Sequence, residues 1–169
     1  MNKVKVVCNT SPIIGLMSIN RLSLLGELFE EIIIPEAVER ELCANSSKHQ
    51  QEIEKIKKCI ANGKFKVYHV QNEEVVKQLY GRLHYGELEV IISAKECGLS
   101  LAIIDERAAR KMASSFLVDT IGILGILTLA KQQGLICSVK QDIDTLRSNG
   151  YRISDVLYEQ ILKRNGEME

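Results

Sequence analysis

VVCNTSPIIGL, residues 6–16, joins the end of a β-branched run to a segment with helical character. The run VKVVC (4–8) predicts a buried strand, because β-branched residues favour strands and turn-forming residues bound this one. Pro12 suits the first helical position, and Ser11 before it is a good N-cap residue. Asn9 and Thr10 then remain at the end of the strand without an evident structural role.

Strand and helix patterns alternate along the rest of the chain. Further strands are predicted at 31–35, 65–70 and 101–105. Helices are predicted at 12–28 with a break near Asn20, 35–42, 47–62, 73–82, 85–97, 106–113, 122–133, 139–148 and 154–164. Strands that alternate with helices favour an α/β fold with a parallel sheet. We expect a single domain over residues 1–169, with C-terminal helices from about 139 to 164.

Composition and charge restrict the classes of protein that fit. The 169 residues are 46% hydrophobic and 26% charged with a formal net charge of zero, so a site for a polyanion must be a local patch. Five cysteines without a C-x-x-C pair indicate neither a zinc site nor a disulfide framework. The N-terminal MNKVKVVCNTS lacks the long apolar segment of a signal peptide, and the longest apolar runs are too short for a membrane span. We therefore expect a cytoplasmic protein that does not enter a membrane.

Polar side chains follow two of the predicted strands. Asn9 comes after VKVVC, and Asp105 ends LAIID. In open α/β sheets the ligand site lies beyond the carboxyl ends of the strands, so both residues are candidates for a site. Asp105 could instead serve only as the N-cap of the next helix.

Two glutamates lie on or beside apolar helix faces. Glu87 shares a stripe with Val90, Ile91 and Ala94, whereas Glu89, Ser93 and Glu96 are predicted on the solvent side. Glu41 falls three and four residues after Val38 and Ala37. Each glutamate could reach solvent from a helix end or pair with an arginine. Together with Asn9 and Asp105, they form a set of oxygen ligands that suits a hard cation such as Mg²⁺ or Mn²⁺.

The ordered set of segments resembles PIN-like domains over nearly the whole chain. These segments are CNTSPIIGL, IIIPEAVERELC, YGELEVIISAKECGLSLAIIDERAARKMA, IGILGILTLAKQQGLI and LRSNGYRISDVLYEQIL. More narrowly, they resemble an uncharacterised, toxin-like (VapC-related) prokaryotic branch with N-T-S-P in the first motif. The resemblance implies a three-layer α/β/α sandwich with a parallel sheet of about four to five strands.

The resemblance also assigns roles to individual residues. The four acidic positions of the family correspond to Asn9, Glu41, Glu87 and Asp105, of which Asn9, Glu87 and Asp105 are expected to hold Mg²⁺ or Mn²⁺. Thr10 and Ser11 match hydroxyl residues after the first acid, although capping explains Ser11 equally well. Asp119 is a poor match to a fifth acid.

A basic helix follows Asp105. Arg107, in its first turn, is the best candidate for binding phosphate, while Arg110 and Lys111 could simply form a solvated face.

The resemblance implies a metal-dependent endoribonuclease that leaves a 5′-phosphate and a 3′-hydroxyl on its RNA substrate. It further implies the toxin half of a toxin–antitoxin pair, a homodimer, and a small antitoxin protein that covers the crevice. Asn9 stands where active PIN nucleases mostly have aspartate, and it therefore favours a rival hypothesis, a catalytically silent module that binds RNA or a protein partner. A structure-specific DNA nuclease is a third hypothesis.

Overall fold

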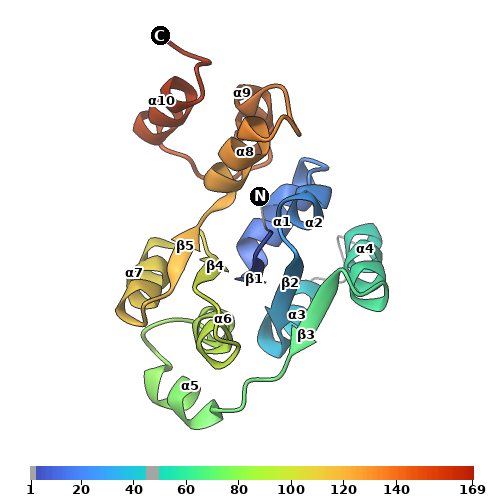
Figure 1. Cartoon of the computed structure of the whole chain (residues 1–169), viewed down its shortest axis with the longest axis vertical. Coiled ribbons are helices and arrows are strands. Elements are labelled where there is room, and N and C mark those ends of the chain that lie inside the picture. The colour runs from blue at the N-terminus through green and yellow to red at the C-terminus, as the bar shows by residue number, and fades with distance from the viewer. Residues whose placement is uncertain (1–2, 45–49) are drawn as a thin grey trace.

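The central sheet of the protein has five parallel strands in the order β3-β2-β1-β4-β5 (Figure 1). The computed structural model describes residues 3–44 and 50–169. Helices cover the sheet as a three-layer α/β/α sandwich, which confirms the predicted fold class. The strands are β1 (Lys5–Cys8), β2 (Glu31–Pro35), β3 (Phe65–Tyr68), β4 (Leu101–Ile103) and β5 (Asp119–Ile121).

The helices follow the predicted segments closely. They are α1 (Thr10–Ser18), α2 (Ser23–Leu28), α3 (Glu36–Ala44), α4 (Gln50–Ala61), α5 (Glu73–Leu79), α6 (Tyr85–Glu96), α7 (Arg107–Ser115), α8 (Ile123–Gln132), α9 (Val139–Ser148) and α10 (Asp155–Arg164). Residues 47–49 of one predicted helix lie outside the described residues. None of the described helices is long and apolar enough to cross a lipid bilayer.

The core forms around β1, which lies in the middle of the sheet between β2 and β4. Val6, Val7 and Cys8 have no exposed surface, as expected for a parallel strand covered on both faces. Helix α6 packs against β1, β2 and β4. Eight of its twelve residues are buried, so α6 is the central helix of the fold.

Helix α1 begins earlier than the sequence suggests. Its first residue is Thr10 and its N-cap is Asn9, so the predicted N-cap Ser11 is wrong. Asn9 already has extended backbone angles and is therefore the residue at which the strand turns into the helix. The predicted break near Asn20 is confirmed, because Asn20 has a positive φ of 56° between α1 and α2.

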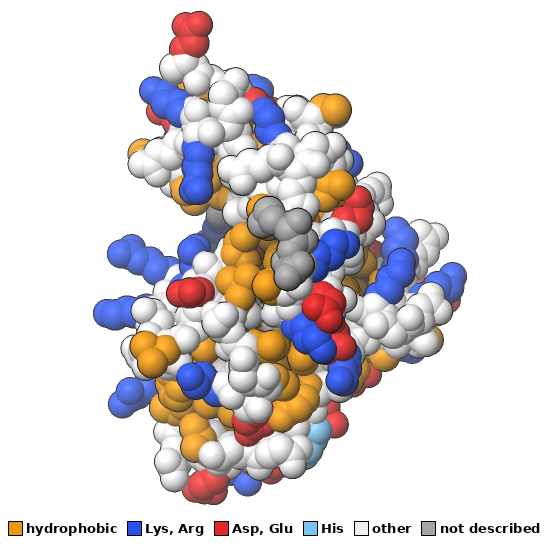
Figure 2. All heavy atoms as spheres, viewed as in Figure 1, with side chains coloured by type: hydrophobic (Ala, Val, Ile, Leu, Met, Phe, Trp, Pro, Cys, Tyr) orange, Lys and Arg blue, Asp and Glu red, His pale blue; other side chains and the backbone are white. Residues whose placement is uncertain are grey.

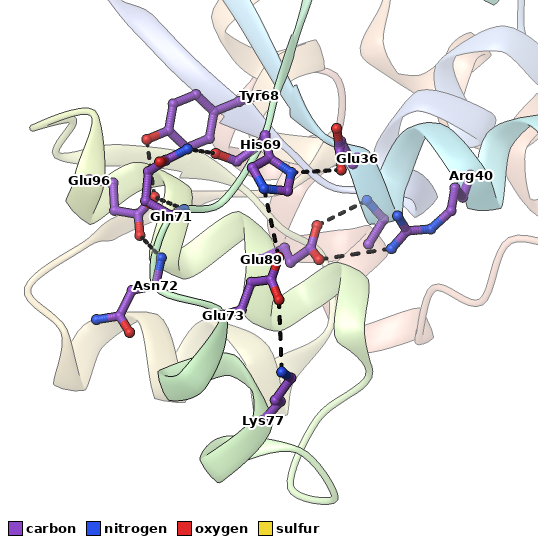
Figure 3. Close-up of polar contacts among 11 residues, drawn as sticks. Glu36, Arg40, Tyr68, His69, Gln71, Asn72, Glu73, Lys77, Glu89 and Glu96 are labelled. Carbon is purple, nitrogen blue, oxygen red and sulfur yellow. Dashed lines mark hydrogen bonds and ion pairs between the residues drawn. The ribbon is translucent and has the colours of Figure 1, made fainter.

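The solvent side predicted for α6 is wrong at two positions. The Ser93 side chain is fully buried. Glu89 is half-buried and accepts a hydrogen bond of 2.9 Å from the backbone N–H of Ala37 at the start of α3, beside an ion pair with Arg40 (Figure 3). A carboxylate at a helix N-terminus is favourable because it meets free N–H groups. Glu89 therefore fixes α3 against α6.

A polar chain continues from this contact toward the β3–α5 connection (Figure 3). His69 lies 2.9 Å from Glu36 and 3.7 Å from Glu73. Glu96, at the end of α6, accepts hydrogen bonds from the Tyr68 hydroxyl and from the backbone of Gln71 and Asn72. These contacts hold the start of the crossover that carries the chain from β3, at one edge of the sheet, to β4 beside β1.

The C-terminal helices gather at the end of the molecule opposite α5 (Figure 1). Leu146 and Leu162 are buried, whereas Val156 and Leu157 on α10 are exposed. The carboxylate of Glu167 accepts hydrogen bonds from Lys131 Nζ at 2.5 Å and from the backbone N–H of Val139 at 2.7 Å. It therefore joins the chain end to the N-terminus of α9 and to α8.

We expect Glu167→Gln to lower the free energy of unfolding by about 1–2 kcal/mol at pH 7, because charge-assisted hydrogen bonds are lost. Burial opposes ionisation, but the bonds from Lys131 and the α9 backbone lower the pKa of Glu167 from 4.5 to about 2. The stabilisation is thus complete above pH 4.5 and is lost as the pH falls toward 2.

Urea denaturation of the wild type and Glu167→Gln between pH 7 and pH 3 measures this difference. Glu159→Gln is the matched control, since Glu159 is exposed on α10. Equal stability of wild type and Glu167→Gln at pH 7 would contradict the assignment.

Candidate active site

The direction in which successive strands are added to the sheet reverses at β1, and this switch point is where a ligand site is expected. From β1 the chain builds β2 and β3 on one side and returns to build β4 and β5 on the other. Ligand sites of open α/β sheets lie at such a switch point, beyond the carboxyl ends of the strands. Asn9 follows β1 there, and its backbone N–H donates a 3.0 Å hydrogen bond to the carbonyl of Ile103 at the end of β4.

Asp105 lies just beyond β4 and is half-buried. Its Oδ1 accepts a 2.9 Å hydrogen bond from the backbone N–H of Ile123, the first residue of α8. The N-cap of the next helix, α7, is Glu106, so the alternative role of Asp105 as the N-cap of that helix is wrong. Asp105 instead bonds the N-terminus of α8. Gly122 makes this approach possible, since a Cβ there would lie 2.5 Å from Oδ1.

The second oxygen of Asp105 is held by Tyr151, a residue that the sequence analysis did not select. The Tyr151 hydroxyl donates a hydrogen bond to Oδ2 of Asp105. Its ring lies over α1 at Gly15, where a Cβ would be 3.1 Å from a ring carbon. No local pattern indicates this contact, because Tyr151 is 46 residues away in sequence. Tyr151 therefore connects α1, Asp105 and the loop before α10.

Glu41 and Thr10 form a second part of the site. The Thr10 hydroxyl donates a 2.6 Å hydrogen bond to Oε2 of Glu41. The same carboxylate lies against Gly86, where a Cβ would be 2.5 Å from Oε1. Glu87, next to Gly86, is 9% exposed and accepts a 3.0 Å hydrogen bond from the backbone N–H of His84. Glu41 and Glu87 are therefore brought to the same edge.

Glu106 connects these two parts and was missed in the sequence, where it looks like an ordinary charge at a helix start. Its Oε1 accepts a 2.8 Å hydrogen bond from the Ser11 hydroxyl. Its charge raises the pKa of both Glu87 and Asp105. Glu106 is thus the additional acid near the site.

Burial and the charges of nearby carboxylates both disfavour the ionised forms of Glu87 and Asp105. Burial raises the pKa of Glu87, and the nearby Glu106 and Glu41 raise it further, against a lowering by the His84 N–H. Burial also raises the pKa of Asp105, more than the hydrogen bonds from Tyr151 and Ile123 lower it. Uncompensated carboxylates in such a setting attract cations.

The remaining candidates divide between the site and other surfaces. Asn9 is 3% exposed at the strand end. Arg107 is exposed at the start of α7, but Arg110 is the basic residue whose charge lowers the pKa of Asp105. Asp119 begins β5 opposite Leu101, the first residue of β4, so it lies at the amino ends of these strands, away from the site beyond their carboxyl ends.

The donor chemistry of the site fits a hard divalent cation. Its side chains are carboxylates and an amide, without cysteine or histidine, as Mg²⁺ and Mn²⁺ prefer. Within residues 3–44 and 50–169, no three Asp, Glu, His or Cys side chains lie close enough to share one ion. Mg²⁺ usually binds one or two carboxylates and keeps several waters, so it needs fewer protein ligands than such a group of three would supply.

A parallel sheet with oxygen donors from separate segments at its switch point defines an α/β protein with an acidic edge site. A family model described as a PIN domain matches residues 5–167, so the chain belongs to the PIN-domain family. No curated protein matches it. PIN domains are in general ribonucleases that use Mg²⁺ or Mn²⁺.

We expect Glu87→Gln to raise the Tm of the protein by a few degrees in EDTA at pH 7. The amide keeps the bond to the His84 N–H and removes a charge that burial, Glu106 and Glu41 disfavour. Because the pKa of Glu87 is raised in the folded state, the wild type loses stability as the pH rises through that pKa. The difference in Tm between the variant and the wild type therefore disappears near pH 4, where Glu87 is protonated.

Thermal melts of the two proteins at pH 4 and pH 7 test this expectation. Glu89→Gln is a control of opposite sign on the same helix, because Glu89 has favourable contacts with Ala37 and Arg40. A Tm for Glu87→Gln below that of the wild type at pH 7 would refute it.

Proposed function

We propose that this protein is a metal-dependent endoribonuclease whose reaction takes place beside Asp105, at the switch point of the sheet. The observation that carries the proposal is the placement of Glu87 and Asp105 at this edge, where burial and the neighbouring Glu106 raise the pKa of both carboxyl groups. Carboxylates that repel one another at one edge of the sheet lower the stability of the folded protein, and a bound cation offsets this loss.

The side chains have distinct roles in this proposal. Asp105, Glu87 and Asn9 hold Mg²⁺ or Mn²⁺, which supplies the Lewis-acid chemistry needed to activate water and stabilise the leaving oxygen of a phosphodiester. Tyr151 and the Ile123 N–H fix both oxygens of Asp105 in direction. Each oxygen retains a lone pair for a further ligand.

The hydroxyl residues support the acids around them. Thr10 orients Glu41 through its hydrogen bond, and Ser11 does the same for Glu106. Both hydroxyls can also turn toward a substrate oxygen, since a hydroxyl donates one hydrogen bond and accepts others. In this proposal Arg107 binds a phosphate of the RNA, and its exposure at the N-terminus of α7 supports that role.

We further propose that the protein acts in the cytoplasm as the toxin of a toxin–antitoxin pair and forms a homodimer. The exposed Val156 and Leu157 on α10 support a contact with a second copy or with a small antitoxin, because apolar side chains gain by leaving water.

A second function, a silent module that binds RNA or a protein without cleaving, is favoured by one observation. Asn9 occupies the buried strand end with a neutral amide, where a carboxylate would add charge to the cation site. Its carbonyl oxygen can still bind Mg²⁺, but more weakly than a carboxylate.

We expect the purified protein to cleave labelled single-stranded RNA with Mn²⁺, and Asp105→Asn to reduce the rate by about 100-fold or more. Removing a hydrogen-bond partner of a metal ligand typically lowers activity by about 10- to 100-fold, and removing a ligand itself should lower it at least as much. Asn9→Asp should increase the rate at low Mn²⁺, since an additional carboxylate charge strengthens cation binding.

Asp119→Asn is the matched control, because Asp119 lies in the same sheet at the amino end of β5, away from the carboxyl ends of the strands. Products with 5′-phosphate and 3′-hydroxyl ends, lost in EDTA, exclude a contaminating metal-independent ribonuclease. Cleavage by neither the wild type nor Asn9→Asp would favour the silent module.

A further inference from the structure

A cavity of about 540 Å³ begins at Asp105 and extends along the C-terminal part of the molecule. One wall consists of the end of β5 and the start of α8. The other wall consists of residues 151–153 and the side of α10 that carries Leu157, Ile161 and Arg164. The cavity therefore shares Asp105, the start of α8 and Tyr151 with the candidate active site, and it adds the side of α10, which that site does not use.

The charges around this cavity are unequal. Arg110, Arg152 and Arg164 line it from three separate segments, against Asp105 as its single lining carboxylate. Asp105 lies at the end where it accepts the hydrogen bond from Tyr151. Figure 2 shows Lys and Arg side chains projecting on the side where α7 lies, beside an indentation below the C-terminal helices.

Two of these arginines are free to bind a ligand. In the described part of the chain, neither the Arg152 nor the Arg164 side chain makes a hydrogen bond or an ion pair. The Arg110 side chain donates a 3.2 Å hydrogen bond to the Thr120 hydroxyl. By contrast, Arg147 pairs with Asp155 close by. Guanidinium groups without carboxylate partners in a concave site are suited to bidentate phosphate binding.

We propose that this cavity binds the sugar–phosphate backbone of a single RNA strand next to the bond at the acidic edge. The inference rests on the proposed function and deepens it, since it assigns the path of the substrate. The apolar surfaces of the cavity include Leu124, Leu157 and Ile161. Among its lining residues, Tyr151 is the single aromatic one, and its hydroxyl is held by Asp105. Binding here thus depends on phosphates and little on base identity.

The size of the cavity agrees with a strand rather than a duplex. Its volume lies in the range of sites that enclose a small molecule of nucleotide size. The zero net charge of the protein also means that affinity for RNA must come from a local cluster of this kind. An acidic segment of a partner protein is the competing occupant that the experiment must separate.

The test measures binding of a fluorescein-labelled ten-nucleotide oligouridylate by anisotropy in EDTA, so cleavage does not enter the result. We expect Arg152→Ala and Arg164→Ala each to weaken binding at least fivefold at 100 mM salt. Each should also reduce the slope of log affinity against log salt by about 0.7, the value for one phosphate contact on a single strand.

Lys163→Ala is the matched control, because Lys163 is an exposed cation on α10 next to Arg164 and does not line the cavity. Its affinity should stay within twofold of the wild type. Equal losses in Lys163→Ala and Arg164→Ala, or no loss in either arginine variant, would overturn the proposal. Tighter binding of an acidic decapeptide than of the RNA, lost in the same arginine variants, would also overturn it.

The two proposals fail in different ways. RNA binding that depends on Arg152 and Arg164 without any cleavage retains the cavity assignment and refutes the nuclease. Cleavage that Asp105→Asn abolishes, with RNA binding unchanged in the arginine variants, retains the nuclease and refutes the cavity assignment.

Discussion

The burial of β1 between two parallel neighbours is the constraint on which the remaining architecture depends. Val6, Val7 and Cys8 are fully buried, so this part of the strand carries no polar side chain. The first polar side chain after it is that of Asn9, just beyond the carboxyl end. The chain leaves β1 toward one edge of the sheet and comes back to pair β4 on its other side. Asn9 and Asp105 are therefore neighbours although they are far apart in sequence, and the helices around them deliver the other acids.

The carboxylates of this protein fall into two groups that differ in what surrounds them. Glu89, Glu96 and Glu167 accept hydrogen bonds from backbone N–H groups at the starts of helices or in a connection, and they hold the fold together. Glu87 and Asp105 also accept such bonds, but burial and neighbouring acids still raise their pKa. Glu89, Glu96 and Glu167 therefore stabilise the metal-free protein. Glu87 and Asp105 are instead carboxylates whose negative charge is not fully compensated by the protein.

The sequence predicted most of the fold because its signals are local. β-Branched runs, helix periodicity and the glycines after α6 and α8 locate strands and helices nearly to the residue. β5 was missed because three residues, partly exposed at an edge, form no recognisable run. Ser93 and Glu89 were misplaced because α6 contacts other helices as well as the sheet, so a single apolar stripe underestimates its burial.

The candidate site was predictable only in part for the same reason. Strand ends and the stripe position led to Asn9, Asp105 and Glu87, but the partners of these residues depend on tertiary contacts. Glu106 carries no distinguishing local pattern, and the helix that Asp105 bonds is α8 rather than the helix that follows it. The roles of the individual residues in binding a cation stay predictions.

The hydrogen bond from Tyr151 to Asp105 makes the C-terminal helices and the acidic edge a single linked system. Tyr151 lies in the connection between α9 and α10, and its ring rests on Gly15 of α1. If Asp105 binds the cation proposed above, a ligand on α10 that shifts this connection changes the affinity for that cation, and thermodynamic reciprocity requires the cation to change the affinity of that ligand by the same factor. A protein partner far from the acids could in this way regulate them without touching them.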